Sequence, residues 1–344
     1  MNQAADLVQE ELLKRFDALL KDNVLAHAYL FVGPALSGKS ETALEIAKLL
    51  NCDHPAQGHP CNECPSCKKI IAQNHPDIYI FEAITKEEDD DGLIRPKLKD
   101  AKEKSQNNQE IRIGQIRYLS SKVQLRPYEA QKKVFIVKSI EKLNDQAANA
   151  FLKTLEEPTA SSLIILTTTA PDKIADTVKS RCQKIYFAPL GAAELKKKLI
   201  QLEGVDQEGA HFLAHLSEGS FGKAISLNDS RVIQRKNKVI NRFIFERDSE
   251  SYLQNLALDK EKTKEAFDIL LTWFRDLMLI KSGVEEIKLI NLDRAKDLKK
   301  MSALYAFDEL ETAVSQITQT SYILSENLNM KITMTLLKEQ LWRN

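Results

Sequence analysis

A phosphate-binding loop near the N-terminus constrains this chain more than any other feature. The loop fits the pattern G-x-x-x-x-G-K-[ST], with an apolar stretch before it and helical apolar spacing after it. In such a strand–loop–helix unit, the loop N–H groups and the helix N-terminus face phosphate oxygens. We expect Lys39 to reach the β- and γ-phosphates and Ser40 to coordinate Mg²⁺. The candidate nucleotide-binding residues are Gly33, Pro34, Ala35, Leu36, Ser37, Gly38, Lys39 and Ser40.

Four of the five cysteines follow the loop helix with the spacing C-x₈-C-x₂-C-x₂-C. Four thiolates with no open coordination position suit a structural, tetrahedral zinc ion. Free thiols, a redox pair and an iron–sulfur cluster are the alternatives. The nearby His54 and His59 are expected to be spectators. The candidate metal ligands are Cys52, Cys61, Cys64 and Cys67.

Short apolar stretches alternate with helical patterns through the first half of the chain. This alternation predicts an α/β fold with a parallel sheet that is covered on both faces, and the phosphate loop at the carboxyl end of one strand. A further short helix is expected to carry Ser180-Arg181-Cys182, with Cys182 a buried thiol and not a nucleophile. Five strands are expected at residues 29–32, 78–81, 133–137, 163–167 and 184–187, and helices at 6–22, 111–123 and 145–155.

Changes in composition divide the chain into three domains. Residues 1–189 form the α/β nucleotide-binding domain, with a zinc module at about 51–70. An acidic, then basic, then amide-rich segment at about 85–110 has little apolar content and is expected to be a mobile surface insertion. Residues 190–230 are expected to form a small helical lid domain. Residues 231–344 are helical in pattern, and their apolar stripes are expected to form a core and a subunit interface.

The charge balance limits the functions available to the chain. It holds 49 Lys and Arg and 49 Asp and Glu, so a protein that coats DNA with a wholly basic surface is excluded, although local basic faces remain possible. No apolar run approaches the ~20 residues of a membrane helix, and the first residues lack the layout of a secretory signal. We therefore expect a cytoplasmic protein with reduced cysteines and no membrane contact.

Four motifs in combination resemble the clamp-loader subunits of bacterial DNA polymerase III, which belong to the AAA+ ATPases. They are HAYLF before the phosphate loop, CNECPSC after it, AANAFLKTLEEP at 147–158, and the tripeptide that contains Arg181. The match covers about residues 7–227, and the remainder fits the family's all-α collar domain in size and pattern. The resemblance implies an AAA+ domain with structural Zn²⁺ and with ATP or ADP and Mg²⁺.

The resemblance also implies partners. The chain would join gamma/tau and delta subunits in a hetero-pentamer that opens the sliding clamp and places it on primed DNA. DNA contacts would go mainly to phosphates and would be insensitive to sequence.

Two kinds of subunit share these motifs: the ATP-hydrolysing gamma/tau motor and its relative, delta prime. Hydrolysis needs an Asp-Glu pair after the strand at 133–137, where Asp orients Mg²⁺ and Glu polarises water. Lys138 and Ser139 occupy those positions here. A lysine puts a cation where the metal shell needs an anion, and serine is too weak a base at neutral pH. Glu141 would need a shift of strand register to replace them.

A second departure agrees with the first. The motor subunit has an arginine on the helix after a Gly-Ser pair, where this chain has Gly222 followed by Lys223. Both departures favour a delta-prime-like subunit that binds ATP without hydrolysing it. The resemblance then gives Arg181 the main role, as an arginine finger supplied in trans to the γ-phosphate on the neighbouring motor subunit. Without the resemblance, we would expect Arg181 only to form an ordinary salt bridge on the surface.

Two other functions stay open. The first is an ATP-hydrolysing gamma/tau-type motor subunit whose acidic pair lies elsewhere. The end of the sequence at Asn344, without the long extension of the tau form, is expected to argue against a motor subunit. The second is a P-loop kinase of a small molecule, against which the cysteine module and the helical second half argue.

Overall fold

The computed structural model describes residues 10–84, 109–246 and 250–323, and the chain divides after Pro189 into two compact units. The expected mobile insertion lies almost entirely outside the described residues.

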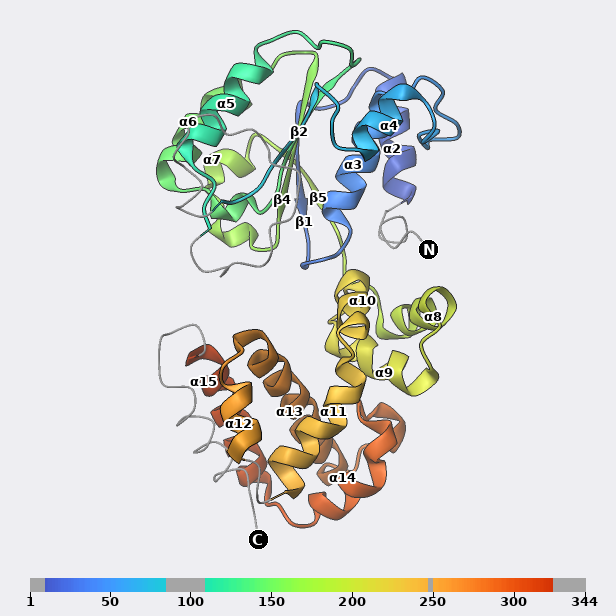
Figure 1. The fold of residues 1–344 in the computed structure, drawn as a ribbon, viewed down its shortest axis with the longest axis vertical. Coiled ribbons are helices and arrows are strands. Elements are labelled where there is room, and N and C mark those ends of the chain that lie inside the picture. Colours follow the sequence, from blue (N-terminus) through green and yellow to red (C-terminus); the bar gives the residue numbers. More distant parts are fainter. Residues whose placement is uncertain (1–9, 85–108, 247–249, 324–344) are drawn as a thin grey trace. The chain divides into compact units, whose positions relative to one another are not determined.

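The first unit is built on a parallel sheet, which within the described residues has five strands in the order β2-β3-β4-β1-β5 (Figure 1). The central strand β1 pairs with β4 on one side and β5 on the other, with Val32 opposite Thr168 and Tyr186. The predicted α/β fold and its five parallel strands are therefore confirmed. The strands are β1 (Ala28–Val32), β2 (Ile78–Phe81), β3 (Lys133–Val137), β4 (Ser162–Thr168) and β5 (Gln183–Tyr186).

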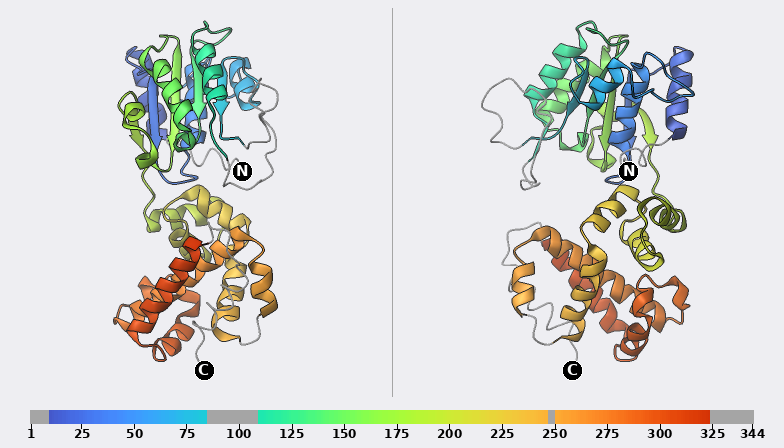
Figure 2. Two further views of the ribbon diagram at one scale, coloured as in Figure 1. Left: turned by 90° about the vertical axis from the view of Figure 1, so that its left-hand side faces the viewer. Right: turned by 45° about the vertical axis from the view of Figure 1, so that its right-hand side comes forward.

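Helices cover both faces of this sheet, as both views in Figure 2 show. Side chains alternate along β1, so Leu30 and Val32 enter one apolar cluster while Tyr29 and Phe31 enter the other. Both faces are buried, which is why the strands read as continuous apolar runs. The first cluster is covered by α5 (Ile113–Val123), α6 (Asp145–Glu156) and α7 (Asp176–Lys179), and the second by α2 (Glu10–Lys21) and α3 (Lys39–Leu50).

The segment around β5 differs from the prediction in two ways. The helix α7 ends at Lys179, so Ser180-Arg181-Cys182 lies in the turn after it and not on a helix. The reason is that β5 begins at Gln183, opposite Tyr29, and the chain must leave the helix to join the sheet. The strand also ends one residue early. Phe187 instead turns its ring against Phe31, with 5.1 Å between ring centroids.

The second unit is helical throughout its described residues, as predicted. Its longest helix, α13, buries Phe267, Trp273 and Phe274, and its fully buried Asp276 accepts the N–H group of Ile290 at 3.0 Å. The division into lid and collar stays a prediction, and residues 324–344 lie outside the described part. The helices are α8 (Ala192–Glu203), α9 (Gln207–Leu216), α10 (Phe221–Asp229), α11 (Val232–Ile240), α12 (Glu250–Leu256), α13 (Lys260–Lys281), α14 (Ala295–Ser302) and α15 (Phe307–Ile323).

A buried carboxylate ties the start of β2 to the loop before β3. Asp77 is 1% exposed, and its oxygens accept the N–H groups of Tyr128, Glu129 and Ala130 at 2.8–2.9 Å. Burial by itself would raise the pKa of Asp77. The three N–H donors and the charge of Lys133, 4.0 Å away, outweigh burial and lower that pKa below its ordinary value.

We expect Asp77→Asn to lower the free energy of unfolding of the first unit by about 1–3 kcal/mol at pH 7, because a buried charge-assisted acceptor is lost. The folded-state pKa is depressed, so the carboxylate stabilises above the unfolded pKa of about 3.9 and loses this effect as pH falls through the folded value. The gap between wild type and variant should therefore close in acid. Urea unfolding at several pH values measures it, with the exposed Asp172→Asn as the control.

Candidate nucleotide and metal sites

The phosphate loop joins β1 to α3, and two of its glycines are required by their surroundings. A Cβ on Gly33 would lie 2.6 Å from the carbonyl oxygen of Phe187 and 2.7 Å from its Cβ, so no larger residue fits. The N–H group of Gly33 donates to the carbonyl of Thr168 at 3.2 Å. Gly38 opens α3 with φ of +83°, a left-handed conformation that favours glycine. The start of the loop is thus fixed to the ends of β4 and β5 by direct contact.

Lys39 lies inside this loop and is 6% exposed. Its ammonium group donates to the carbonyl of Gly33 at 2.9 Å, to the Ser37 hydroxyl at 3.2 Å and to the carbonyl of Pro34. Burial lowers the pKa of Lys39 to about 8, and the charge of Glu141 opposes that shift. The loop therefore gathers a cation and the N-terminus of a twelve-residue helix at one point, the arrangement that binds phosphate.

The two positions after β3 carry no acid. Lys138 forms an ion pair with Glu82 at the end of β2, so its charge is partly neutralised at this edge of the sheet. Ser139 has φ of +54°, and its N–H group donates to the Thr167 hydroxyl at 3.3 Å. Neither side chain supplies the carboxylate that a metal shell or an attacking water requires.

Glu141 is a residue that sequence reasoning undervalued. It follows β3 on a 3₁₀ turn, Ile140–Lys142, and its Oε1 accepts the Thr169 hydroxyl at 3.0 Å. Thr169 comes next to Thr168, whose carbonyl accepts the Gly33 N–H group, so the carboxylate lies near the loop without any shift of register. Its Oε2 is buried and has no hydrogen-bond partner among the described residues. Strand alternation gave no signal for this, because a turn and not a strand positions it.

Arg181 lies at the opposite edge of the sheet from the phosphate loop. It precedes β5, where Gln183 pairs with Tyr29, whereas the loop follows the far end of β1. The five residues of β1 separate the two edges of the sheet by roughly 17 Å. The Arg181 side chain is 33% exposed and donates through Nη2 to Glu156 Oε1 at 2.5 Å. Arg181 is therefore kept apart from the loop of its own chain.

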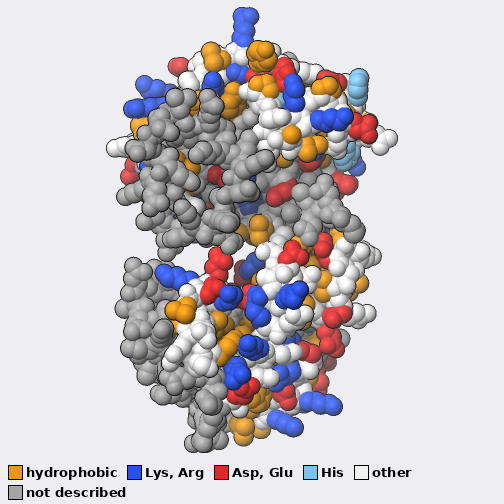
Figure 3. Space-filling view, viewed as in Figure 1, with side chains coloured by type: hydrophobic (Ala, Val, Ile, Leu, Met, Phe, Trp, Pro, Cys, Tyr) orange, Lys and Arg blue, Asp and Glu red, His pale blue; other side chains and the backbone are white. Residues whose placement is uncertain are grey.

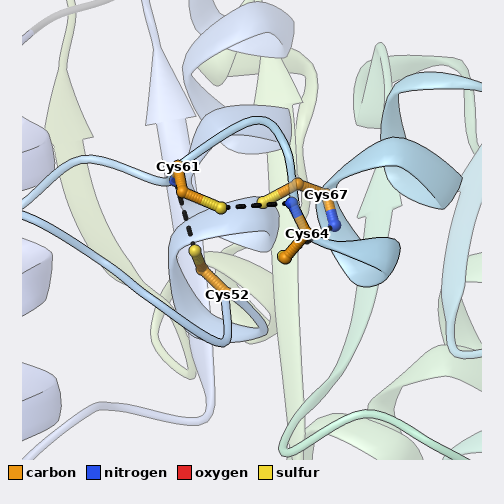
Figure 4. Close-up of side chains that lie close together, drawn as sticks. All are labelled: Cys52, Cys61, Cys64 and Cys67. Carbon is orange, nitrogen blue, oxygen red and sulfur yellow. Dashed lines mark hydrogen bonds between the residues drawn. The ribbon is translucent and has the colours of Figure 1, made fainter.

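The four predicted cysteines come together after α3 (Figure 4). Their Sγ atoms all lie within 4.8 Å of one another, close to the spacing of about 3.8 Å that a tetrahedral zinc–thiolate site requires. The N–H groups of Cys61, Cys64 and Cys67 donate to the sulfurs of Cys52, Cys61 and Cys64 at 3.2, 3.3 and 3.4 Å. Within the described chain, this group of candidate ligands includes neither His54 nor His59.

The surroundings shift the pKa values of the clustered thiols in both directions. N–H groups of Glu63 and Cys64 lower the pKa of the Cys61 thiol to about 6. Burial raises the pKa of Cys52 and Cys67. Four thiolates this close repel one another, and a divalent ion removes that repulsion while satisfying every sulfur. The cluster is thus one that could hold zinc.

The fifth cysteine, Cys182, does not belong to this cluster. Cys182 is buried, and burial raises the pKa of its thiol to about 12, so it is an inert core thiol as expected.

No helix in the described ranges has the length and apolar character needed to cross a bilayer. On the face drawn in Figure 3, Lys and Arg side chains are interspersed with Asp and Glu.

Comparisons with known proteins agree with this architecture. The family model described as "DNA polymerase III, delta subunit" matches residues 8–191, and "DNA polymerase III, delta subunit, C terminal" matches residues 230–343. DNA polymerase III subunit delta' of Bacillus subtilis is 28% identical over 92% of this chain and 90% of its own length. Subunit delta' of Pseudomonas aeruginosa is 32% identical over 62% of this chain and 60% of its own.

Gamma/tau proteins are also similar. Subunit tau of Bacillus subtilis is 31% identical over 65% of this chain, which corresponds to 36% of the tau sequence. Among solved structures, a gamma subunit-related protein of Thermotoga maritima covers 97% of this chain and 98% of its own, with 20% identity and a TM-score of 0.47. The resemblance drawn from the motifs is confirmed by the family models: the chain belongs to the DNA polymerase III delta subunit family, as a clamp-loader subunit of the delta prime type.

Proposed function

We propose that this chain is a non-hydrolysing subunit of the replicative clamp loader, which helps to load the sliding clamp on primed DNA. The observation that carries the proposal is the edge after β3, where Lys138 pairs with Glu82 and Ser139 follows. Phosphoryl transfer to water needs carboxylates at those positions, both to orient Mg²⁺ and to polarise the water. The loop around Lys39 is intact, so ATP or ADP with Mg²⁺ would be held without turnover.

In this proposal Arg181 acts on a neighbouring subunit. It lies a full strand length from the loop of its own chain, and its guanidinium is partly exposed. An arginine that cannot reach its own nucleotide is free to reach another across an interface, where it stabilises the charge that develops in phosphoryl transfer. The neighbour would be a gamma/tau-type motor subunit.

The partners follow from the same role. The relatives named above are subunits of DNA polymerase III, so we propose assembly with gamma/tau and delta subunits into a hetero-pentamer in the cytoplasm. The helical lid, residues 190–230, and the collar, residues 231–344, would join that assembly. Contacts to primed DNA would go to its phosphates. On the face drawn in Figure 3, Lys and Arg alternate with Asp and Glu, which supports a small number of phosphate contacts there and not a wholly basic face.

The alternative is a gamma/tau-type motor, and Glu141 is the observation that favours it. Its Oε2 atom is buried, and its charge raises the pKa of Lys39 against the effect of burial. One carboxylate would have to orient the metal and activate the water at once, whereas hydrolysis by this family uses two acids. We therefore rank the motor second.

The metal proposal is tested by the zinc content of the purified full-length chain. We expect one equivalent of zinc, released by a strong chelator together with a fall in melting temperature, because structural zinc contributes folding free energy. Cys67→Ser should abolish zinc retention, while Cys182→Ser, a buried thiol outside the cluster, should retain it. Iron in place of zinc, or no metal in a protein purified under reducing conditions, would contradict the assignment.

The nucleotide site is tested on the isolated chain. We expect ATP and ADP to bind in the presence of Mg²⁺ with no measurable turnover, and Lys39→Ala to abolish binding in calorimetry. Affinity should fall as pH rises past about 8, because Lys39 then loses the proton that phosphate binding requires. Turnover that disappears in Glu141→Gln would identify a motor and refute the proposal of a non-hydrolysing subunit.

The arginine is tested in a complex reconstituted with gamma/tau- and delta-type subunits of the same organism. Arg181→Ala should lower ATP turnover strongly in the presence of clamp and primed DNA. The reason is that an arginine finger raises the hydrolysis rate at a single site by ~10³-fold or more. Lys39→Ala should change turnover little. A strong loss of turnover with Lys39→Ala and little change with Arg181→Ala would show that this chain hydrolyses the ATP bound at its own loop.

A further inference from the structure

We infer that Glu156 is the positioning residue for Arg181, holding the guanidinium ready for a phosphate on the neighbouring subunit. The inference rests on the proposed trans role of Arg181. Glu156 ends α6, within the AANAFLKTLEEP motif, and lies 25 residues before the arginine that it contacts. The sequence singled out both motifs but gave no reason for their being together.

Three hydrogen bonds fix the guanidinium. Nη2 donates to Glu156 Oε1 at 2.5 Å, and Nη1 donates to the carbonyl of Thr177 at 2.8 Å and to the Ser180 hydroxyl at 3.4 Å. An arginine side chain has five N–H donors in a rigid fork. The three contacts therefore leave donors for phosphate oxygens, so a phosphate can bind without displacing Glu156.

The supports of the guanidinium are themselves rigid. Glu156 follows Leu155 on α6, and Thr177 precedes Val178 on α7; Leu155 and Val178 are each 1% exposed in the same apolar cluster. Cys182, next to the arginine, belongs to that cluster as well. The partners of Arg181 are thus anchored to one packed core, which limits the rotamers that the arginine samples.

The ion pair is partly open to water, with 33% of the Arg181 side chain and 47% of the Glu156 side chain exposed. Such a pair adds little to folding stability. Its effect is on the reaction, because an arginine already held in place loses less side-chain freedom when it engages phosphate. Glu156 does not touch the reacting atoms, so it acts only through Arg181.

A double-mutant cycle in the reconstituted clamp loader tests the inference. Glu156→Ala, Arg181→Ala and the double variant are compared for ATP turnover against ATP concentration, with clamp and primed DNA present. We expect Glu156→Ala to lower kcat roughly three- to tenfold, the size expected for freeing one long side chain, with KM for ATP unchanged. In the Arg181→Ala background, Glu156→Ala should have no further effect.

Matched variants separate positioning from charge and folding. Glu157→Ala removes the adjacent exposed carboxylate and should leave turnover and melting temperature unchanged. Glu156→Gln keeps an acceptor for Nη2 and should recover part of the lost activity.

Each remaining outcome overturns a defined claim. If Arg181→Ala lowers turnover but Glu156→Ala does not, or if the two effects simply add, the inference fails while the proposed function stands. A rise in turnover with Glu156→Ala would mean that Glu156 withholds the arginine, which also refutes positioning. If Arg181→Ala has no effect, both the trans role and the inference are wrong.

Discussion

The close approach of Gly33 to Phe187 is the contact on which the geometry of the first unit depends. Gly33 sits where β1, β4 and β5 end together, with its N–H group on Thr168 and no room for a Cβ. Once these three ends are level, the phosphate loop must leave the sheet at that edge. By the same register, the residues before β5 must collect at the other edge. The parallel register of β1 and β5 therefore separates the loop from Arg181.

In the proposed function, this separation would let one domain take part in two nucleotide sites. The loop and Glu141 lie at the carboxyl edge of the sheet, and Arg181 and Glu156 lie at the amino edge. The helix α6 spans the distance between them, since it begins just after the turn that carries Glu141 and ends at Glu156. Its buried face is packed on the sheet, so the two edges are joined by a rigid element and not by a loop.

The sequence predicted the parts that depend on residue type and spacing, and missed those that depend on turns. The phosphate loop, the grouping of the four cysteines and the strands of a covered parallel sheet follow from local patterns of residue type and spacing. The positions of Glu141 and Arg181 do not, because a 3₁₀ turn and a helix end direct these side chains. Glu156 was also out of reach, since nothing local links it to a residue 25 positions away.

The helix α3 has a consequence for how the length of this chain can vary. It starts at Lys39 in the phosphate loop and ends at Leu50, two residues before Cys52. Each residue added to a helix rotates the next part of the chain by about 100° and advances it by about 1.5 Å. An insertion or deletion within α3 would thus swing Cys52 away from the other three sulfurs. The exposed stretch at 53–57 is constrained as well, because the N–H group of His54 donates to the Cys52 sulfur and Ala56 exchanges two hydrogen bonds of 2.9 Å with His59.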